Sequence, residues 1–287
     1  MILVTGASGT VGRAVLTEVK QSGAKHRAMY RSQAEAAKAP KGTETVIADF
    51  ADKQSLGAAM RGVEGLYLVC APVPELVELE SNAIDAAKAA GVKRVVLNSA
   101  LGAGDYNKSF PSWHRKVEDK LRAIGMANCI IRPNSFHQNV LSYYAPTIRT
   151  QGAFYDAMGD SRASYLDVRD IATVVTRALG GGEHDGRIYE LNGPEALTCA
   201  EVAQKISSHT GVAVRYMDLT IEAQRKALLE AGMPEAMVTP LLDLKLYYRS
   251  GKGGELDGTL QRLIGREPIT MDKFLAENVD QLRGQAA

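Results

Sequence analysis

Residues 1–12 read Met1-Ile2-Leu3-Val4-Thr5-Gly6-Ala7-Ser8-Gly9-Thr10-Val11-Gly12, an apolar run followed by a turn punctuated by glycines. Arg13-Ala14-Val15-Leu16 then opens a helical pattern. A tight turn needs a residue that tolerates positive φ, a second glycine lets the backbone approach a pyrophosphate, and a third lets the helix pack closely on the strand. The helix start adds free N–H groups and the positive end of its dipole. Because these glycines lie between a strand and a helix, they predict a dinucleotide site.

Composition sets modest bounds on the fold and the partners. A chain of 287 residues is one large domain or two modest ones. Lys plus Arg number 34 against 33 for Asp plus Glu, a balance that argues against nucleic acid as a partner. No stretch is apolar and long enough to span a bilayer, and no signal peptide precedes the first strand, so we expect a cytoplasmic protein without a membrane partner.

Cysteine and histidine spacing gives no sign of metal binding. Cys70, Cys129 and Cys199 are scattered and are expected to be small buried hydrophobes in a reducing compartment. The five histidines lie far apart, so no metal site is predicted.

Strand and helix patterns alternate with short links through the first half of the chain. Strands are predicted at 26–30, 45–48, 65–70, 93–99 and 128–133, with helices between them. This alternation predicts an α/β fold, a Rossmann-type doubly wound parallel sheet. We place the dinucleotide-binding domain at 1–152, with 166–192 returning to it. A smaller, mostly helical substrate lobe is expected at 193–287, with 153–165 contributing; Ser250–Gly254 is expected to be a solvent turn.

The end of the second strand bears on cofactor choice. In a dinucleotide fold this point lies beside the adenosine ribose, where an acid favours NAD and an arginine accepts the 2′-phosphate of NADP. Residues 29–32 contain no acid, and Arg31-Ser32 stand in its place. The alternative is a solvated arginine at a strand end. The sequence therefore predicts NADP(H).

Ligands of such sheets bind beyond the carboxyl ends of the strands, so the predicted site residues follow those ends. The predicted cofactor-binding residues are Gly6, Ser8, Gly9, Thr10, Val11, Gly12, Arg31, Asp49, Phe50, Cys70, Ala71, Pro72, Asn98, Ser99, Pro133, Asn134, Ser135 and Phe136. A small-molecule acceptor is expected to contact Ala100, Leu101, Tyr106, Trp113, Phe136 and Tyr165, although aromatic side chains often only pack.

Several stretches together carry a family resemblance: Val4–Gly12, Arg31, Gly91–Ala100, His114–Glu118, Ile131–Asn134, Tyr165–Ala172 and Leu263–Pro268. With these motifs the chain resembles an atypical short-chain dehydrogenase/reductase of the NmrA-like group. Within that group it is similar to bacterial NADPH-dependent quinone reductases and triphenylmethane-dye reductases. The resemblance spans nearly the whole chain and is weakest at 215–250. It leaves a homodimer open, because members of this group can pair through helices of the dinucleotide domain.

One departure from the wider superfamily concerns catalysis. That superfamily moves a proton with a tyrosine and a lysine four residues apart and an upstream serine. Here those positions fall on Phe110 and His114, while Ser99 stands roughly where the serine would lie. The resemblance implies a role for His114, which would bind the nicotinamide ribose or donate a proton; the alternative is a polar residue lining a helix start. His114 and Ser99 are the predicted catalytic residues, and His114 is also a predicted cofactor contact.

Two classes of function follow from the resemblance. The first is an enzyme that transfers hydride from NADPH to a quinone-like or conjugated aromatic acceptor without a Tyr-Lys proton relay. The second is a non-catalytic, NADP(H)-sensing NmrA-like regulator. A sugar-nucleotide epimerase or dehydratase is disfavoured, because those reactions need the missing tyrosine–lysine pair. The sequence favours the reductase.

Overall fold

The computed structural model describes residues 1–283, which form two compact units. The first unit contains Met1–Asn107, Pro111–Pro133 and Ile171–Glu190. The second contains Lys108–Phe110, Asn134–Asp170 and the described residues from Leu191 onward.

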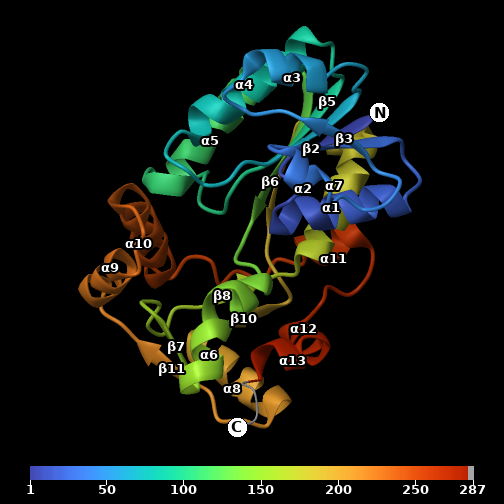
Figure 1. Ribbon diagram of the computed structural model, residues 1–287. Helices are drawn as coiled ribbons and strands as arrows, with labels where there is room; N and C mark the ends of the chain where they lie inside the picture. Colours follow the sequence, from blue (N-terminus) through green and yellow to red (C-terminus); the bar gives the residue numbers. More distant parts are fainter. Residues whose placement is uncertain (284–287) are drawn as a thin grey trace. The chain divides into compact units, whose positions relative to one another are not determined.

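A seven-stranded sheet forms the centre of the first unit (Figure 1). Its strand order is β3-β2-β1-β4-β5-β6-β9, and the pairs from β3 to β6 are all parallel. The strands are β1 (Ile2–Val4), β2 (His26–Tyr30), β3 (Glu44–Ile47), β4 (Gly65–Leu68), β5 (Arg94–Asn98), β6 (Ala127–Pro133) and β9 (Arg187–Leu191). The order changes direction at β1, which is the switch point of a doubly wound sheet.

Helices cover both faces of this sheet. Helices α3, α4 and α5 lie on one face, and α1 and α7 lie on the other (Figure 1). The helices of this part of the chain are α1 (Thr10–Gln21), α2 (Gln33–Ala36), α3 (Lys53–Ala59), α4 (Leu76–Ala89), α5 (Ser109–Ala123), α7 (Val168–Gly180) and the 3₁₀ turn η2 (Gly182–His184). The predicted fold class, a Rossmann-type parallel sheet, is confirmed.

Alternation along the strands builds the core under α3, α4 and α5. Leu66 and Leu68 of β4 and Leu97 of β5 all belong to one buried cluster. Side chains two residues apart share a face of a strand, so these strands present leucine repeatedly to the same layer of helices. Ile84 of α4 and Leu121 of α5 complete the contact from the helix side. The strands are covered on both faces, which explains their nearly continuous apolar sequences.

The second unit is largely helical and contains two small sheets. Strands β8 (Ala163–Tyr165) and β10 (Glu195–Leu197) pair antiparallel, and β7 (Ala153–Asp156) and β11 (Arg215–Asp218) pair in parallel. Its helices are the π-helix η1 (Val140–Tyr144), α6 (Ala145–Gln151), α8 (Cys199–Thr210), α9 (Ile221–Glu230), α10 (Glu235–Arg249), α11 (Thr259–Ile264), α12 (Met271–Glu277) and α13 (Val279–Leu282). A capping box of Thr198 and Glu201 begins α8.

The division of the chain differs from the expected one in position. The first unit's run ends at Pro133, whereas the sequence predicts a boundary at 152. The reason is that residues after β6 pair within the second unit: the His137 N–H donates to the Leu166 carbonyl at 2.9 Å. The expected solvent turn at 250–254 is only partly exposed, because Gly253 is buried and its carbonyl accepts a bond from the Ser164 N–H.

Candidate cofactor and active site

The turn between β1 and α1 has room for only glycine at two of its positions. Gly6 has φ +56°, and a Cβ there would lie 2.7 Å from Val69 Cγ1. A Cβ at Gly12 would lie 2.0 Å from the Gly6 carbonyl oxygen, so Gly12 allows α1 to pack against the turn. A Cβ at Gly9 would meet only the Gly6 carbonyl oxygen, at 3.2 Å. Gly6 and Gly12 are therefore required by the fold, whereas Gly9 leaves its outer side open.

The start of α1 has the properties of an anion site. Gly9 is the N-cap residue, with φ −81° and ψ 171°, and it provides no side chain to cap the helix. The first turn, Thr10 to Gly12, contains no acidic residue. A helix start of this kind presents backbone N–H groups and a positive dipole end. The residues present therefore fit a pyrophosphate.

Arg31 follows β2 directly, and α2 begins two residues later. The Ser32 hydroxyl caps α2 by accepting the Glu35 N–H at 3.2 Å. The Glu35 carboxylate accepts from the Arg31 backbone N–H at 3.2 Å and from the Ser8 hydroxyl at 3.5 Å. An arginine side chain and a carboxylate therefore both occur at this point of the fold.

Asp49 and Phe50 follow β3, and Asp49 Oδ1 accepts the Ala51 N–H at 2.8 Å. Cys70, which follows β4, is half-buried, and burial raises the pKa of its thiol to about 12. After burial, the charge of Glu80 contributes most to raising that pKa, while the charge of Arg31 lowers it and the charge of Asp49 raises it. The thiol is protonated at neutral pH and is a poor nucleophile. Ala71 and Pro72 beyond it are exposed.

Glu80 of α4 is wholly buried close to this edge of the sheet. Within residues 1–283, neither of its carboxyl oxygens has a hydrogen-bond partner. Burial raises the pKa of Glu80 to about 8. The nearby Cys70 N–H lowers this pKa only in part, because it does not meet the geometry of a full hydrogen bond to the carboxyl group. Burial, and after it the charge of Glu80, raises the pKa of the Tyr67 phenol, whose hydroxyl donates to Asn98 Oδ1 at 3.1 Å. Glu80 is thus a carboxylic acid that the fold keeps protonated at neutral pH.

We predict that Glu80→Gln stabilises the protein, and does so more as the pH rises. The pKa is about 8 in the folded chain and about 4.5 unfolded, so the protonated acid favours folding below pH 4.5 and this advantage is lost as pH rises through 8. At roughly 1.4 kcal/mol per pKa unit, the gain in unfolding free energy should grow by about 3 kcal/mol between pH 5 and pH 8. Urea unfolding at both pH values measures it, with exposed Glu78→Gln as the control. A gain independent of pH would contradict the protonated acid.

Ser99, at the end of β5, is held by a buried ion pair that the sequence does not reveal. Its hydroxyl donates to Glu118 Oε1 at 2.5 Å. Arg132 donates to both oxygens of Glu118, through Nε at 2.9 Å and Nη2 at 2.7 Å, and also to Glu190 at 3.1 Å. The Glu118 side chain is 0% exposed and that of Arg132 is 9% exposed. Because its proton is committed to Glu118, Ser99 can offer only its lone pairs to a ligand.

His114 lies four residues before Glu118 on α5, and therefore on the same helix face. It is buried, and its Nδ1 has no hydrogen-bond partner within residues 1–283. Burial lowers the pKa of His114 to about 4, a shift that the charge of Glu118 only partly offsets. The ring is therefore neutral at physiological pH, and its Nδ1 is a buried polar atom without a partner among the described residues.

The remaining predicted residues of the first unit have mixed surroundings. Asn98 and Leu101 are buried, and Ala100 is half-buried. Tyr106 is half-buried, and Trp113 packs against the core cluster under α3 to α5, which gives it a structural role. Pro133 is buried, and its carbonyl accepts the Leu101 N–H.

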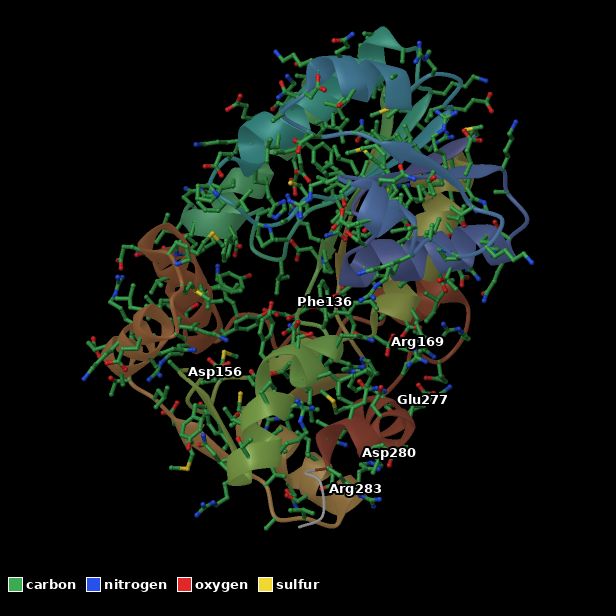
Figure 2. All side chains as sticks on the ribbon, in the orientation of Figure 1. Phe136, Asp156, Arg169, Glu277, Asp280 and Arg283 are labelled. Atoms are coloured by element: carbon green, nitrogen blue, oxygen red, sulfur yellow. The ribbon has the colours of Figure 1, made fainter. Side chains whose placement is uncertain are left out.

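Asn134 to Phe136 and Tyr165 belong to the second unit. Asn134 Nδ2 donates to Asn192 and to the Gly253 carbonyl, and its Oδ1 accepts from Tyr248, so its side chain is fully used within the protein. Ser135 and Phe136 are half-buried. Phe136, which is labelled in Figure 2, forms an isolated β-bridge with Leu166. Tyr165 is 2% exposed, and burial raises the pKa of its phenol well above its usual value. Tyr165 presents almost no surface to a substrate.

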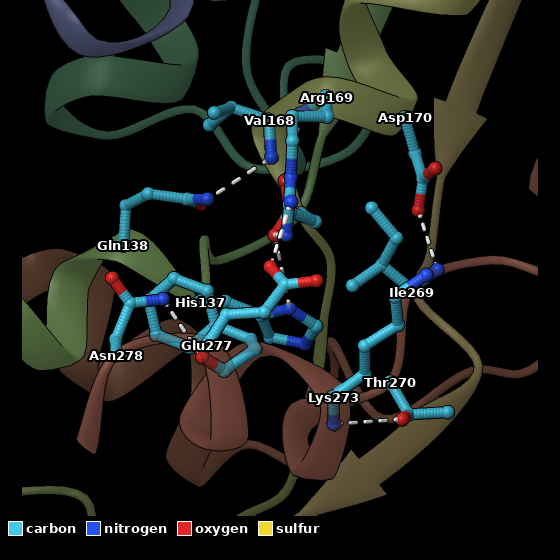
Figure 3. A network of polar contacts seen from close by, with 12 residues as sticks. His137, Gln138, Val168, Arg169, Asp170, Ile269, Thr270, Lys273, Glu277 and Asn278 are labelled. Carbon is cyan, nitrogen blue, oxygen red and sulfur yellow. Dashed lines mark hydrogen bonds and ion pairs between the residues drawn. The ribbon is translucent and has the colours of Figure 1, made fainter.

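Residues 167–170, the second-unit part of the stretch from Tyr165 to Ala172, contribute to a network of polar contacts (Figure 3). Arg169 bridges the buried Asp167, at 2.8 Å, and Glu277 of α12, at 2.7 Å. Burial opposes ionisation of Asp167, but the bonds from Arg169 and the nearby His137 ring hold its pKa well below its usual range. Asp170 accepts the Ile269 N–H at 2.8 Å. These bonds fasten α12 and the segment before it to the start of α7.

Residues 1–283 show neither a candidate metal centre nor a candidate membrane span. No group of three or more His, Cys, Asp or Glu side chains there is arranged to hold a metal ion. No helix in the same range is both long and apolar enough to cross a membrane.

The fold and the glycine turn define a dinucleotide-binding protein of the Rossmann type. The chain belongs to the NmrA-like family, whose model matches residues 1–275. It is 34% identical to an NAD(P)H azoreductase of Xenophilus azovorans over 96% of each chain, and 31% identical to quinone oxidoreductase 2 of Escherichia coli over 98% of each.

Solved structures agree with this assignment. The NADPH complex of an Escherichia coli quinone oxidoreductase matches with a TM-score of 0.87 at 30% identity, covering 98% of this chain and 99% of that one. The NADP(H) complex of a Citrobacter triphenylmethane reductase matches with a TM-score of 0.84 at 21% identity, over 97% of this chain and all of that one. The second likeness supports the fold alone.

Proposed function

We propose that the chain is an NADPH-dependent reductase that transfers hydride to a quinone-like or conjugated aromatic acceptor. The observation that carries this proposal is the site of the first unit: an uncapped helix start and Arg31, together with Ser99 and a neutral His114 beside one buried carboxylate. The relatives named as an NAD(P)H azoreductase and a quinone oxidoreductase, similar over nearly the whole chain, support it.

The residues of the first unit would divide the binding of NADPH among them. The N–H groups at the start of α1 would hold the pyrophosphate, and Arg31 would pair with the 2′-phosphate. Ser99 would accept a hydrogen bond from the nicotinamide half of NADPH. The Nδ1 atom of His114 would form a hydrogen bond with the same half of the cofactor. When bound, NADPH supplies the hydride.

Proton delivery is the step for which this chain lacks the usual side chains. Phe110 and His114 occupy the positions of the tyrosine and the lysine, and a histidine with a pKa of about 4 carries no extra proton at neutral pH. A quinone spreads the incoming negative charge over its conjugated system, so its reduction does not require an acid at the moment of hydride transfer. Orientation and exclusion of water would then be the main contributions of the protein.

Turnover of an acceptor panel tests the proposal. Purified chain is mixed with NADPH and, in separate reactions, with quinones, azo dyes, triphenylmethane dyes and simple aldehydes as the control class. We expect NADPH oxidation with conjugated acceptors and none with aldehydes, which need a proton donor. If no acceptor is reduced while NADPH and NADP⁺ bind with different affinities, the chain is a sensor of the NADP(H) ratio and the proposal fails.

We predict that His114→Ala lowers kcat about tenfold or more, the effect of losing one buried hydrogen bond to the reacting complex. The Kd for NADPH should change less than kcat does. Because His114 is neutral above about pH 4, its titration should not produce a step in the kcat of the wild type near pH 6.5. The pH profiles of the wild type and the variant should therefore have the same shape in that range. Steady-state kinetics from pH 5 to 9 measure both effects. A wild-type step near pH 6.5 that disappears in the variant would show instead that His114 acts as an acid.

A further inference from the structure

Glu35 lies between the two segments that flank an adenosine ribose in a dinucleotide fold, the glycine turn and the end of β2. Its carboxylate accepts from the Ser8 hydroxyl in the turn, at 3.5 Å, and from the Arg31 N–H after β2, at 3.2 Å. The pKa of the neighbouring Tyr30 phenol is raised first by burial and then by the charge of Glu35. The charge of Glu35 is therefore felt at the end of β2.

The contacts of Glu35 exceed what capping of α2 requires. In a capping box the carboxylate returns to the N–H of the N-cap residue, which here is Ser32. Glu35 instead bonds to the N–H of Arg31, one residue outside the helix cap, and reaches Ser8 in the phosphate turn. No acid occurs at 29–32, so Glu35 supplies from α2 the carboxylate that NAD-dependent folds place at the end of this strand.

We infer that Glu35 is a specificity-determining residue that lets the site accept NADH as well as NADPH. The inference rests on the proposed function, since it needs the nucleotide to bind at the glycine turn. The carboxylate accepts a hydrogen bond from a free ribose 2′-hydroxyl and repels a 2′-phosphate. Arg31 does the opposite, because its guanidinium attracts the phosphate. The balance between Glu35 and Arg31 sets the cofactor preference.

The test measures the Kd values of NADPH and NADH by fluorescence titration for the wild type and for Glu35→Gln. Glutamine keeps the side-chain length and removes the charge. We expect the wild type to bind both cofactors within about tenfold of each other. In Glu35→Gln the ratio of NADPH to NADH affinity should rise by roughly tenfold, the size of a like-charge contact near a surface. Glu35→Lys should raise it further, and Arg31→Ala should lower it.

A matched control removes one negative charge at the opposite end of the sheet. Glu64→Gln does this, since Glu64 precedes β4 and pairs with Lys93, and it should leave the ratio unchanged. Thermal unfolding of each variant confirms that it is folded. If Glu35→Gln changes neither affinity, or weakens both equally, Glu35 only orders the segment after β2 and the inference is wrong. If the wild type binds neither cofactor, the proposed function itself fails.

Discussion

A Glu118→Ala variant is expected to lose about 3 kcal/mol of unfolding free energy, the largest stability effect that we predict from a single buried contact. Glu118 is completely buried and accepts two bonds from Arg132 and one from Ser99. Among residues 1–283, removing it leaves the guanidinium with only its bond to Glu190, whose side chain is 47% exposed. A buried charge without a partner destabilises the fold by more than the ion pair stabilises it. The loss of unfolding free energy should therefore be large.

Urea unfolding of three variants separates the lost charge from lost packing. Glu118→Gln keeps the shape and should cost less than Glu118→Ala. The double variant Glu118→Leu with Arg132→Met removes both charges and should recover much of the stability, because apolar residues of similar volume often replace a buried pair without loss. A cost below about 1 kcal/mol for Glu118→Ala would mean that water reaches Arg132 and that the pair does not hold Ser99 in place.

A Gly9→Val variant is expected to weaken NADPH binding by about a hundredfold or more while leaving the chain folded. Gly9 has an ordinary extended φ, and its Cβ would meet only one protein atom, at 3.2 Å. The added methyl groups would instead occupy the space in front of the start of α1, where the proposed pyrophosphate site lies. Isothermal titration with NADPH and thermal unfolding measure the two effects.

Gly57→Val is the matched control for Gly9→Val. Gly57 lies on the exposed side of α3, far along the chain from the turn. Apart from the backbone of its own helix and its chain neighbours, a Cβ added there would have no atom of the described residues within 4 Å. This variant should keep wild-type affinity for NADPH. Unchanged affinity in Gly9→Val would place the cofactor elsewhere, and equal losses in both variants would point to a general effect on folding.

The sheet could be predicted because its signals are local. Each strand is a short apolar run, each helix has its own periodicity, and Gly6, Gly9 and Gly12 mark the turn between the first two elements. The family assignment follows from the same motifs and is confirmed. The boundary between the two units is harder to predict than the strands. It depends on the pairing of the segment after β6 with Leu166, a residue far along the chain.

The polar groups of the site are harder to predict because they depend on pairing between distant residues. Glu118 accepts from both Ser99 and Arg132 only once α5 packs beside β5 and β6. Burial sets the protonation of Glu80 and His114, and the burial of a single polar residue cannot be predicted from its residue type alone. The sequence at the end of the second strand, residues 29–32, contains no acid. Glu35 is not predicted there because it lies on the next helix and reaches the strand end only through its side chain.

The central claim, hydride transfer from NADPH bound at the glycine turn, is tested most directly by a single-turnover reaction. The chain is loaded with one equivalent of NADPH carrying deuterium at the transferring position of nicotinamide C4, and is mixed with excess quinone. We predict that the bound NADPH is oxidised in full, one per quinone reduced, and more slowly than unlabelled NADPH. Bound NADPH that stays reduced, or quinone reduction without loss of NADPH, would contradict the claim.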